Sequence, residues 1–173
     1  PGFFREFAVV PERNLAPIPE KLSLAEATLF EPLAVVVHSL KLAAVRMGET
    51  AAVFGAGPIG AMTVACLKLA GAARVWAVEP VAHRREMALQ AGADAVLDPR
   101  AVDPVAEILR ETGNRGVDLA ADCAAKDDTI NQCIRLVRSA GRVLLTGIPS
   151  GVHTPVEFSH LRRKEAALLN VRR

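Results

Sequence analysis

The chain has 173 residues, a length that suits one domain of ordinary size and is short for two. Hydrophobic residues make up 51% and charged residues 23%, which excludes a disordered chain, and three widely spaced cysteines exclude a disulfide scaffold. The net charge of +2 argues against a nucleic-acid or membrane-surface partner. No stretch has the pattern of a membrane span or of a secretory signal, so we expect a soluble, reduced, cytoplasmic protein. The first residue is proline rather than methionine, which suggests a piece of a longer protein.

The first 24 residues contain half of the six phenylalanines, and Pro11, Pro17 and Pro19 interrupt them. This composition predicts an extended strand and loop rather than part of a compact core. From residue 22 to residue 44 the pattern becomes helical, and we expect Pro32 to break or restart the helix.

After Gly48, short apolar runs alternate with helical segments. Strands are predicted over residues 50–54, 74–79, 95–98, 117–123, 142–146 and 166–171. Helices are predicted over residues 58–70, 83–91, 104–112 and 128–139.

The residues at the helix ends agree with this division. Asp103 before Pro104 is typical of a helix start, and the expected helix ends are Gly71, Gly92, Gly113 and Gly141. Strands that are apolar on both faces and alternate with helices predict an α/β fold. We therefore expect a doubly wound parallel sheet of about six strands, covered by helices on both faces.

The glycine-rich segment Gly55-Ala-Gly-Pro-Ile-Gly60 is the strongest chemical signal. It follows a predicted strand and opens a predicted helix, the context in which this motif binds a dinucleotide. Gly55 permits the tight turn, Gly57 lacks the Cβ that would block a pyrophosphate, and Gly60 lets the helix approach the sheet. The helix N-terminus then faces the phosphates.

Glu79 ends the second predicted strand, 19 residues after Gly60. A carboxylate at this place accepts hydrogen bonds from the adenosine ribose and disfavours a 2′-phosphate, so NAD is favoured over NADP. Arg84 and Arg85 follow shortly and leave NADP open, because an arginine there could receive that phosphate.

Several segments, in this order and spacing, resemble the medium-chain dehydrogenase/reductase superfamily, and its zinc-dependent polyol and threonine branch most. They are residues 2–11, 31–38, 55–60, 79–84, 91–94 and 163–173. The resemblance implies a Rossmann domain over residues 31–173 and, over residues 1–30, a remnant of a GroES-like catalytic domain. It also implies hydride transfer between a polyol or secondary alcohol and a nicotinamide cofactor, in a full-length enzyme that is a homo-oligomer.

The resemblance also implies which residues contact the cofactor. These are Gly55, Gly57, Pro58, Ile59, Gly60, Glu79, Arg84, Cys123, Ala124, Thr146, Gly147, Ile148, Val171, Arg172 and Arg173. Most of them follow strands, and ligands gather at the carboxyl ends of the strands in such sheets.

Glu31 matches an acidic residue near the catalytic zinc of the polyol branch, which makes it the one candidate metal residue in this chain. Zinc needs three or four close ligands, and the family's other ligands would lie upstream of residue 1. We therefore expect this chain to hold no zinc, to bind NAD weakly at best and to be inactive alone.

Two alternatives stay open. One is a zinc-independent quinone or enoyl reductase of the same superfamily, against which only Glu31-Pro32 argues. The other is a non-enzymatic nucleotide-sensing module, which fits the length but not the first residues. A reactive thiol at Cys123 lacks an obvious activating base. The basic run from Arg162 to Lys164 is predicted to be a solvated face.

Overall fold

The computed structural model describes residues 4–126 and 128–172 and divides the chain into two compact units, Pro1–Glu31 and Pro32–Arg173. The division falls beside the boundary that we expected. The assignment of the first unit to a catalytic domain stays a prediction.

The first unit contains the short 3-10 helix η1 (Glu12–Asn14), the helix α1 (Leu24–Ala27) and the start of the helix α2 (Phe30–Leu42). Residues 4–24 form no strand, so this part of the prediction is wrong. Prolines there lack the N–H that a strand ladder requires, and nearly all of the side chains are exposed. The helix restarts at Phe30, which places Pro32 in the first turn, where a missing N–H breaks no helical bond.

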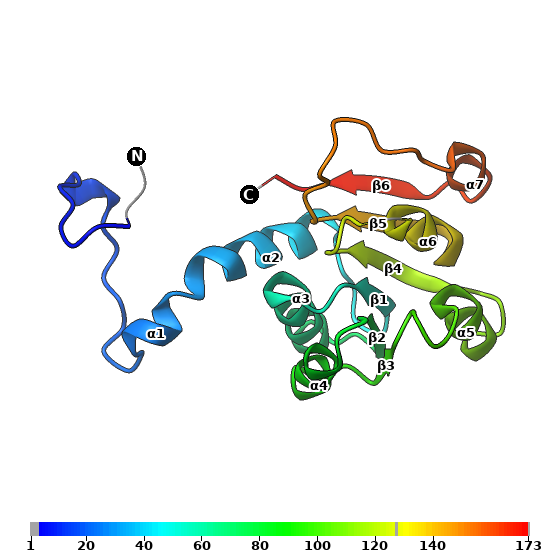
Figure 1. Ribbon diagram of the computed structural model, residues 1–173, viewed down its shortest axis with the longest axis horizontal. Helices are drawn as coiled ribbons and strands as arrows, with labels where there is room; N and C mark the ends of the chain where they lie inside the picture. Colours follow the sequence, from blue (N-terminus) through cyan, green and yellow to red (C-terminus); the bar gives the residue numbers. More distant parts are fainter. Residues whose placement is uncertain (1–3, 127, 173) are drawn as a thin grey trace. The chain divides into compact units, whose positions relative to one another are not determined.

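The second unit is built on a parallel sheet with the strand order β3-β2-β1-β4-β5-β6 (Figure 1). Its strands are β1 (Thr50–Phe54), β2 (Arg74–Val78), β3 (Ala95–Leu97), β4 (Val117–Asp122), β5 (Val137–Leu145) and β6 (Ala167–Asn170). Its helices are α3 (Pro58–Leu69), α4 (Ala82–Gln90), α5 (Pro104–Glu111), α6 (Thr129–Leu136) and α7 (Phe158–Arg163), together with most of α2. The predicted doubly wound α/β fold is confirmed.

Both faces of the sheet are buried, because successive residues of each strand point to opposite sides. On one face, Val53 packs with the inner residues of α2, α3 and α4. On the other face, Phe54 packs with those of α5, α6 and α7. The helices cover the two faces of the sheet, and a binding site can form at the carboxyl ends of the strands.

Three of the four expected helix-ending glycines adopt the left-handed conformation after α3, α4 and α5. Gly141 was wrongly predicted, because it lies inside β5. The predicted helix over 128–139 ends at Leu136, and the chain turns at once into β5 at Val137. A side chain from outside α6 satisfies the carbonyl groups at this end: Lys164 Nζ donates to the carbonyls of Ile134, Arg135 and Val137.

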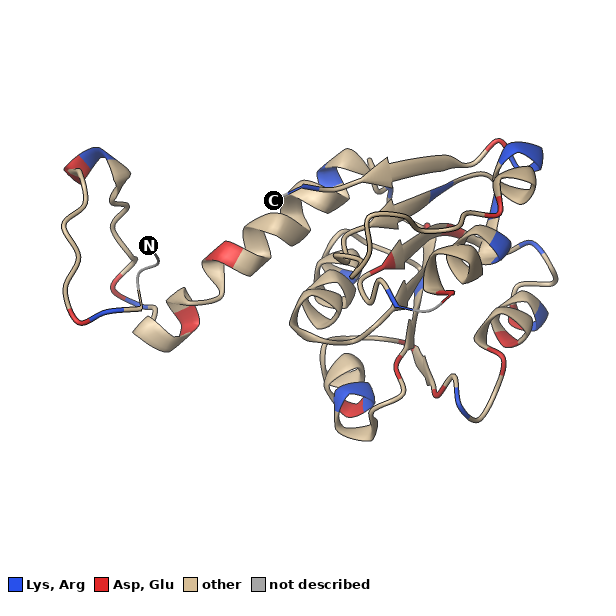
Figure 2. Ribbon diagram, turned by 45° about the horizontal axis from the view of Figure 1, so that its top comes forward, with Lys and Arg blue, Asp and Glu red and all other residues tan. Residues whose placement is uncertain are grey.

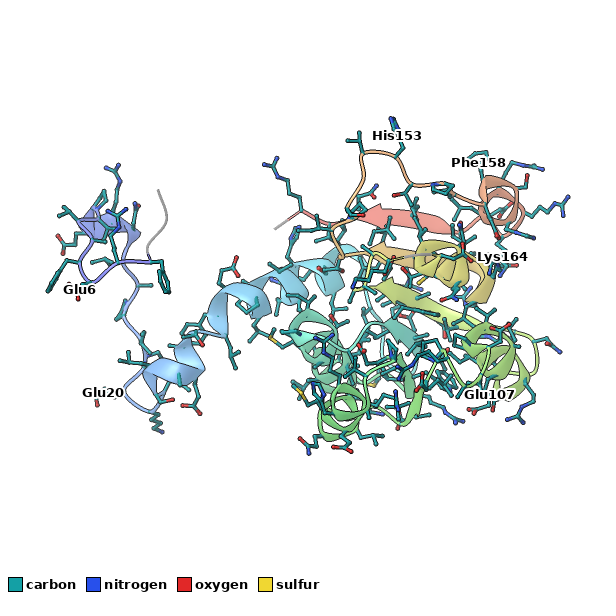
Figure 3. All side chains as sticks on the ribbon, in the orientation of Figure 1. Glu6, Glu20, Glu107, His153, Phe158 and Lys164 are labelled. Carbon is teal, nitrogen blue, oxygen red and sulfur yellow. The ribbon has the colours of Figure 1, made fainter. Side chains whose placement is uncertain are left out.

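This contact corrects the prediction that Lys164 lies on a solvated face. Its ammonium group is half-buried against α6, and burial lowers its pKa (Figure 3). The helix before it, α7, was not predicted at all. None of the helices in the described part of the chain has both the length and the apolar character that a membrane crossing requires.

Candidate cofactor-binding site

The glycine turn, residues 55–60, joins β1 to α3 and is packed tightly on one side. Gly55 has a φ of +89°, and its N–H donates to the carbonyl of Val78 over 2.8 Å. A Cβ at Gly60 would stand 1.8 Å from the carbonyl oxygen of Gly55, which no side chain permits. Gly55 and Gly60 therefore have the packing roles expected from the sequence.

The other side of the turn is open. Gly57 lies just before α3, and a Cβ built there would meet no atom within 4 Å. No side chain caps this helix, and Pro58 occupies its first turn. An open glycine before an uncapped helix N-terminus fits a pyrophosphate group, because free N–H groups and the positive end of the helix dipole attract phosphate oxygens.

Glu79 follows β2 and is only 3% exposed. Its Oε2 accepts a hydrogen bond from the N–H of Ala56 at 2.8 Å, and its Oε1 accepts one from the N–H of Val81 at 3.0 Å. The structure thus places the predicted ribose-binding acid directly against the glycine turn. Each carboxylate oxygen can accept a further bond, so these contacts leave capacity for ribose hydroxyls.

The two arginines after Glu79 differ in their surroundings. Arg84 is exposed in the first turn of α4. Arg85 donates to the carbonyls of Glu79 and Pro80, each over 2.8 Å, and pairs with Asp98 at 3.1 Å. Asp98 was not predicted to have a function. It directly follows β3, the neighbour of β2, so the carboxyl-end rule could have identified it.

The loop after β4 packs against the glycine turn, and the loop after β5 meets the loop after β4. Asp122, the last residue of β4, accepts bonds at Oδ1 from the N–H groups of Ala124 (3.0 Å) and Ala125 (2.8 Å). Its carbonyl accepts from the N–H groups of Thr146 (3.0 Å) and Gly147 (2.9 Å). Asp122 therefore fixes the backbone at both predicted contact segments, a positioning role that the sequence did not reveal.

Cys123 is not a reactive thiol. Burial raises its pKa to about 12. Its Sγ lies 3.9 Å from the hydroxyl of Thr63, and the buried hydroxyl of Thr146 lies beside it as well. A protonated thiol in this position fills space beneath the loops and is a poor nucleophile.

A pocket of about 670 Å³ opens beside the carboxyl ends of β4, β5 and β6. Three predicted contact residues line it, Gly147, Ile148 and Val171. Lys126 and His153 also line it, although neither was predicted to have a function. Arg172 is exposed just beyond Val171, and Arg173 lies outside the described residues.

The loop over residues 147–156, which we call the strap, forms one wall of this pocket. Asn131 anchors its far end, since its Nδ2 donates to the carbonyl of Pro155 (3.2 Å) and its Oδ1 accepts from the N–H of Glu157 (2.9 Å). Arg135 pairs with the Glu157 carboxylate at 3.0 Å and, with His160, lowers its pKa to about 2. The strap is thus held at both ends, by Asp122 and by α6.

Glu31 lies exposed in the first turn of α2. Within residues 4–126 and 128–172, no group of three or more His, Cys, Asp or Glu side chains could hold a metal ion. One carboxylate does not satisfy zinc, so the described residues do not fit a zinc site by themselves.

Along the ribbon, acidic and basic residues are interspersed (Figure 2).

Residues 58–173, more than half of the chain, match the family model described as zinc-binding dehydrogenase. The chain is 37% identical over 160 residues to L-threonine 3-dehydrogenase of Pyrococcus horikoshii, which covers 92% of this chain and 45% of that protein. The chain therefore spans about half the length of the curated relatives that it matches.

Solved structures agree. A putative zinc-binding dehydrogenase of Sinorhizobium meliloti bound to NADP superimposes with a TM-score of 0.83 and 33% identity, over 89% of this chain and 46% of that one. An alcohol dehydrogenase of E. coli complexed with NADH gives a TM-score of 0.86 and 28% identity, over 95% and 48%. The resemblance found in the sequence is confirmed: the chain belongs to the zinc-binding dehydrogenase family.

Proposed function

We propose that this chain is the nicotinamide-cofactor-binding half of a dehydrogenase, and that the whole protein transfers hydride between a polyol or secondary alcohol and NAD. The observation that carries the proposal is the glycine turn: Gly57 is open at the uncapped start of α3, and Glu79 is bonded to the same turn. The named dehydrogenases among the relatives support it.

The residues have distinct tasks in this proposal. The N–H groups at the start of α3 bind the pyrophosphate, and the Glu79 carboxylate accepts the ribose hydroxyls. The backbone at residues 146–148 and 171–173, with Cys123 and Ala124 beneath, positions the nicotinamide ring, and Arg84 flanks the adenine. The bound cofactor supplies the hydride chemistry.

The substrate class rests on Glu31. We propose that Glu31 lies near the catalytic zinc of the whole protein, and that this favours a polyol or a secondary alcohol as substrate. The relative named for oxidation at carbon 3 of threonine, a hydroxyl-bearing carbon, is consistent with this class. The family match disfavours the sensing module and the zinc-independent reductase. The homo-oligomeric state and the cytoplasmic location stay predictions.

The test is a titration of the 173-residue chain with NADH, followed by cofactor fluorescence. Gly57→Val is the sharpest variant, because Gly57 has an ordinary negative φ of −67° and open space for a side chain. We expect its fold and unfolding free energy to match those of the parent, while its NADH affinity falls by about tenfold or more.

Ala106→Val, at an exposed position of α5, is the matched control and should bind NADH as the parent does. Because this chain alone is expected to bind weakly, the titration extends to high NADH concentrations, and absence of any binding there would contradict the proposal. Equal affinity in Gly57→Val and the parent would remove the glycine turn from the site.

A further inference from the structure

One carboxylate, that of Asp98, holds two arginines at the turn between β2 and α4. This turn, residues 79–81, carries Glu79. The N–H of Glu79 donates to the carbonyl of Leu97 in β3 (3.0 Å) and so connects the turn to that strand. Asp98 is the residue after β3, so the adjacency of β2 and β3 brings it to the turn.

Arg85 of α4 and Arg100, which follows β3 in the chain, both contact the turn. Arg85 Nη1 donates to the carbonyls of Glu79 and Pro80 (2.8 Å each) and pairs with Asp98 Oδ2 at 3.1 Å. Arg100 Nη2 also donates to the Pro80 carbonyl. Its Nε lies 3.1 Å from Asp98 Oδ1 and its Nη2 lies 3.0 Å from Oδ2, a two-point contact.

The charges at this turn balance. The bonds from Arg100 lower the pKa of Asp98 to about 2, so the carboxylate is ionised at neutral pH. The Asp98 bond raises the pKa of Arg100, and the charge of Glu79 contributes to the same effect, which places Arg100 within electrostatic range of the predicted ribose acid. The Asp98 carboxylate thus faces two guanidinium groups at the turn that carries the predicted ribose-binding acid.

A 2′-phosphate needs a cation that can pair with it, and Asp98 already pairs with Arg85 and Arg100, whereas the exposed Arg84 lies outside this pairing. NADP differs from NAD by a phosphate on the adenosine ribose, and proteins that take NADP offer an arginine to it. Guanidinium groups bind phosphate through paired hydrogen bonds, and this geometry is occupied when the same group already forks onto a carboxylate. The Arg100 side chain is 67% exposed, and among the described residues it donates to Asp98 and to the Pro80 carbonyl.

We propose that Asp98 is a cofactor-selectivity residue, which disfavours NADP by pairing Arg85 and Arg100 beside Glu79 and cancelling their charge. The inference rests on the proposed dinucleotide-binding function. The proposal assigns the NAD selectivity of the site to Asp98, which follows β3, in addition to Glu79, which follows β2.

The experiment compares NADH and NADPH affinities of the full 173-residue chain and its Asp98→Asn variant by fluorescence titration. Asparagine keeps the shape and the acceptor oxygen, and it removes the charge. We expect the ratio of NADPH to NADH affinity to rise about tenfold, and the rise to shrink at high salt because it is electrostatic. Glu107→Gln is the control: Glu107 pairs with Arg110 on the exposed face of α5 (Figure 3), and its loss should leave the ratio unchanged.

Two further variants make the result decisive. The double variant Asp98→Asn/Arg100→Gln should return the ratio toward the parent value, since the freed cation is gone. Arg100→Gln alone should lower the ratio of NADPH to NADH affinity, because the Asp98 carboxylate then has one guanidinium partner fewer. This exposed substitution tests the selectivity role of Asp98 even if Asp98→Asn does not fold.

The failures are distinguishable. No dinucleotide binding by the parent chain would overturn the proposed function and the inference with it. NADH binding by the parent with an unchanged ratio in Asp98→Asn, or in Arg100→Gln, would overturn the selectivity role of Asp98 alone. A gain in Asp98→Asn that persists in the double variant would keep the role of Asp98 and assign the released charge to Arg85, its other partner.

Discussion

The carboxylate of Glu79 accepts a hydrogen bond from the backbone N–H of Ala56 over 2.8 Å, and this bond ties the end of β2 to the glycine turn after β1. A second bond, from the N–H of Val81, holds the carboxylate from the α4 side. The acid predicted to bind ribose therefore also shapes the turn predicted to bind the pyrophosphate. We therefore expect both stability and cofactor affinity to depend on this one side chain.

Glu79→Ala tests this double role. The N–H groups of Ala56 and Val81 would lose their acceptors, so we expect the free energy of unfolding to fall by about 1–3 kcal/mol. NAD affinity should also fall and the difference between NAD and NADP should narrow, because the like charge that opposes a 2′-phosphate is gone. Urea denaturation and paired cofactor titrations measure both effects, with the exposed Glu86→Ala as control. An unchanged NAD affinity would remove Glu79 from the site.

Gly60→Ala tests the packing of the glycine turn. The added methyl would stand 1.8 Å from the Gly55 carbonyl oxygen, a backbone atom that cannot rotate aside. We expect a loss of about 3 kcal/mol or more in the free energy of unfolding. Gly57→Ala is the matched control, since it adds the same methyl to open space three residues earlier. Equal stability of the two variants would show that α3 can shift away from β1.

Asp118 links stability to pH at the amino end of the sheet. Burial raises the pKa of this carboxyl, but bonds from Arg115, Thr50 and Arg138 outweigh burial and hold it well below its usual range. A carboxyl whose pKa is lowered by folding stabilises the fold fully above its unfolded pKa of about 4, and this contribution is lost as the pH falls below that value.

Asp118→Asn should therefore lower the free energy of unfolding by about 2–3 kcal/mol at neutral pH. The difference from the parent should shrink as the pH falls below about 4, because the parent then loses the same charge. Denaturant unfolding of both proteins across this pH range provides the measurement. A constant difference at all pH values would show that the charge of Asp118 contributes nothing.

Lys164→Met tests what ends α6. The ammonium group donates to three carbonyls, those of Ile134, Arg135 and Val137, and methionine leaves them without this donor in a half-buried place. We expect the free energy of unfolding to fall by about 1–3 kcal/mol. Arg163→Met, at the exposed neighbouring position, should change it by less than about 0.5 kcal/mol. Similar losses in both variants would indicate a general effect of the basic run.

Local patterns determined most of the framework. Apolar runs separated by glycine-ended helices predicted all six strands within a few residues, apart from the start of β5. This succeeded because the burial of a strand and the end of a helix depend on residues that are neighbours in the sequence. The motif from Gly55 to Gly60 was placed correctly for the same reason, since each glycine answers a local backbone requirement. The strand predicted in the first 24 residues is absent from residues 4–24, because the prolines there lack the N–H groups that a strand ladder requires.

Long-range contacts decided the rest. The carbonyl groups at the end of α6 accept hydrogen bonds from Lys164, which lies beyond the strap and α7 in the sequence. The pairing of Asp98 with Arg85 exists because β3 lies beside β2, and the anchoring of the strap by Asn131 joins residues more than 20 positions apart. The sequence by itself determined the turns and strand ends that carry the predicted dinucleotide contacts, because turn and strand chemistry is local. Only the tertiary structure decided which side chains hold those residues in place, because such partners meet only once the sheet is assembled.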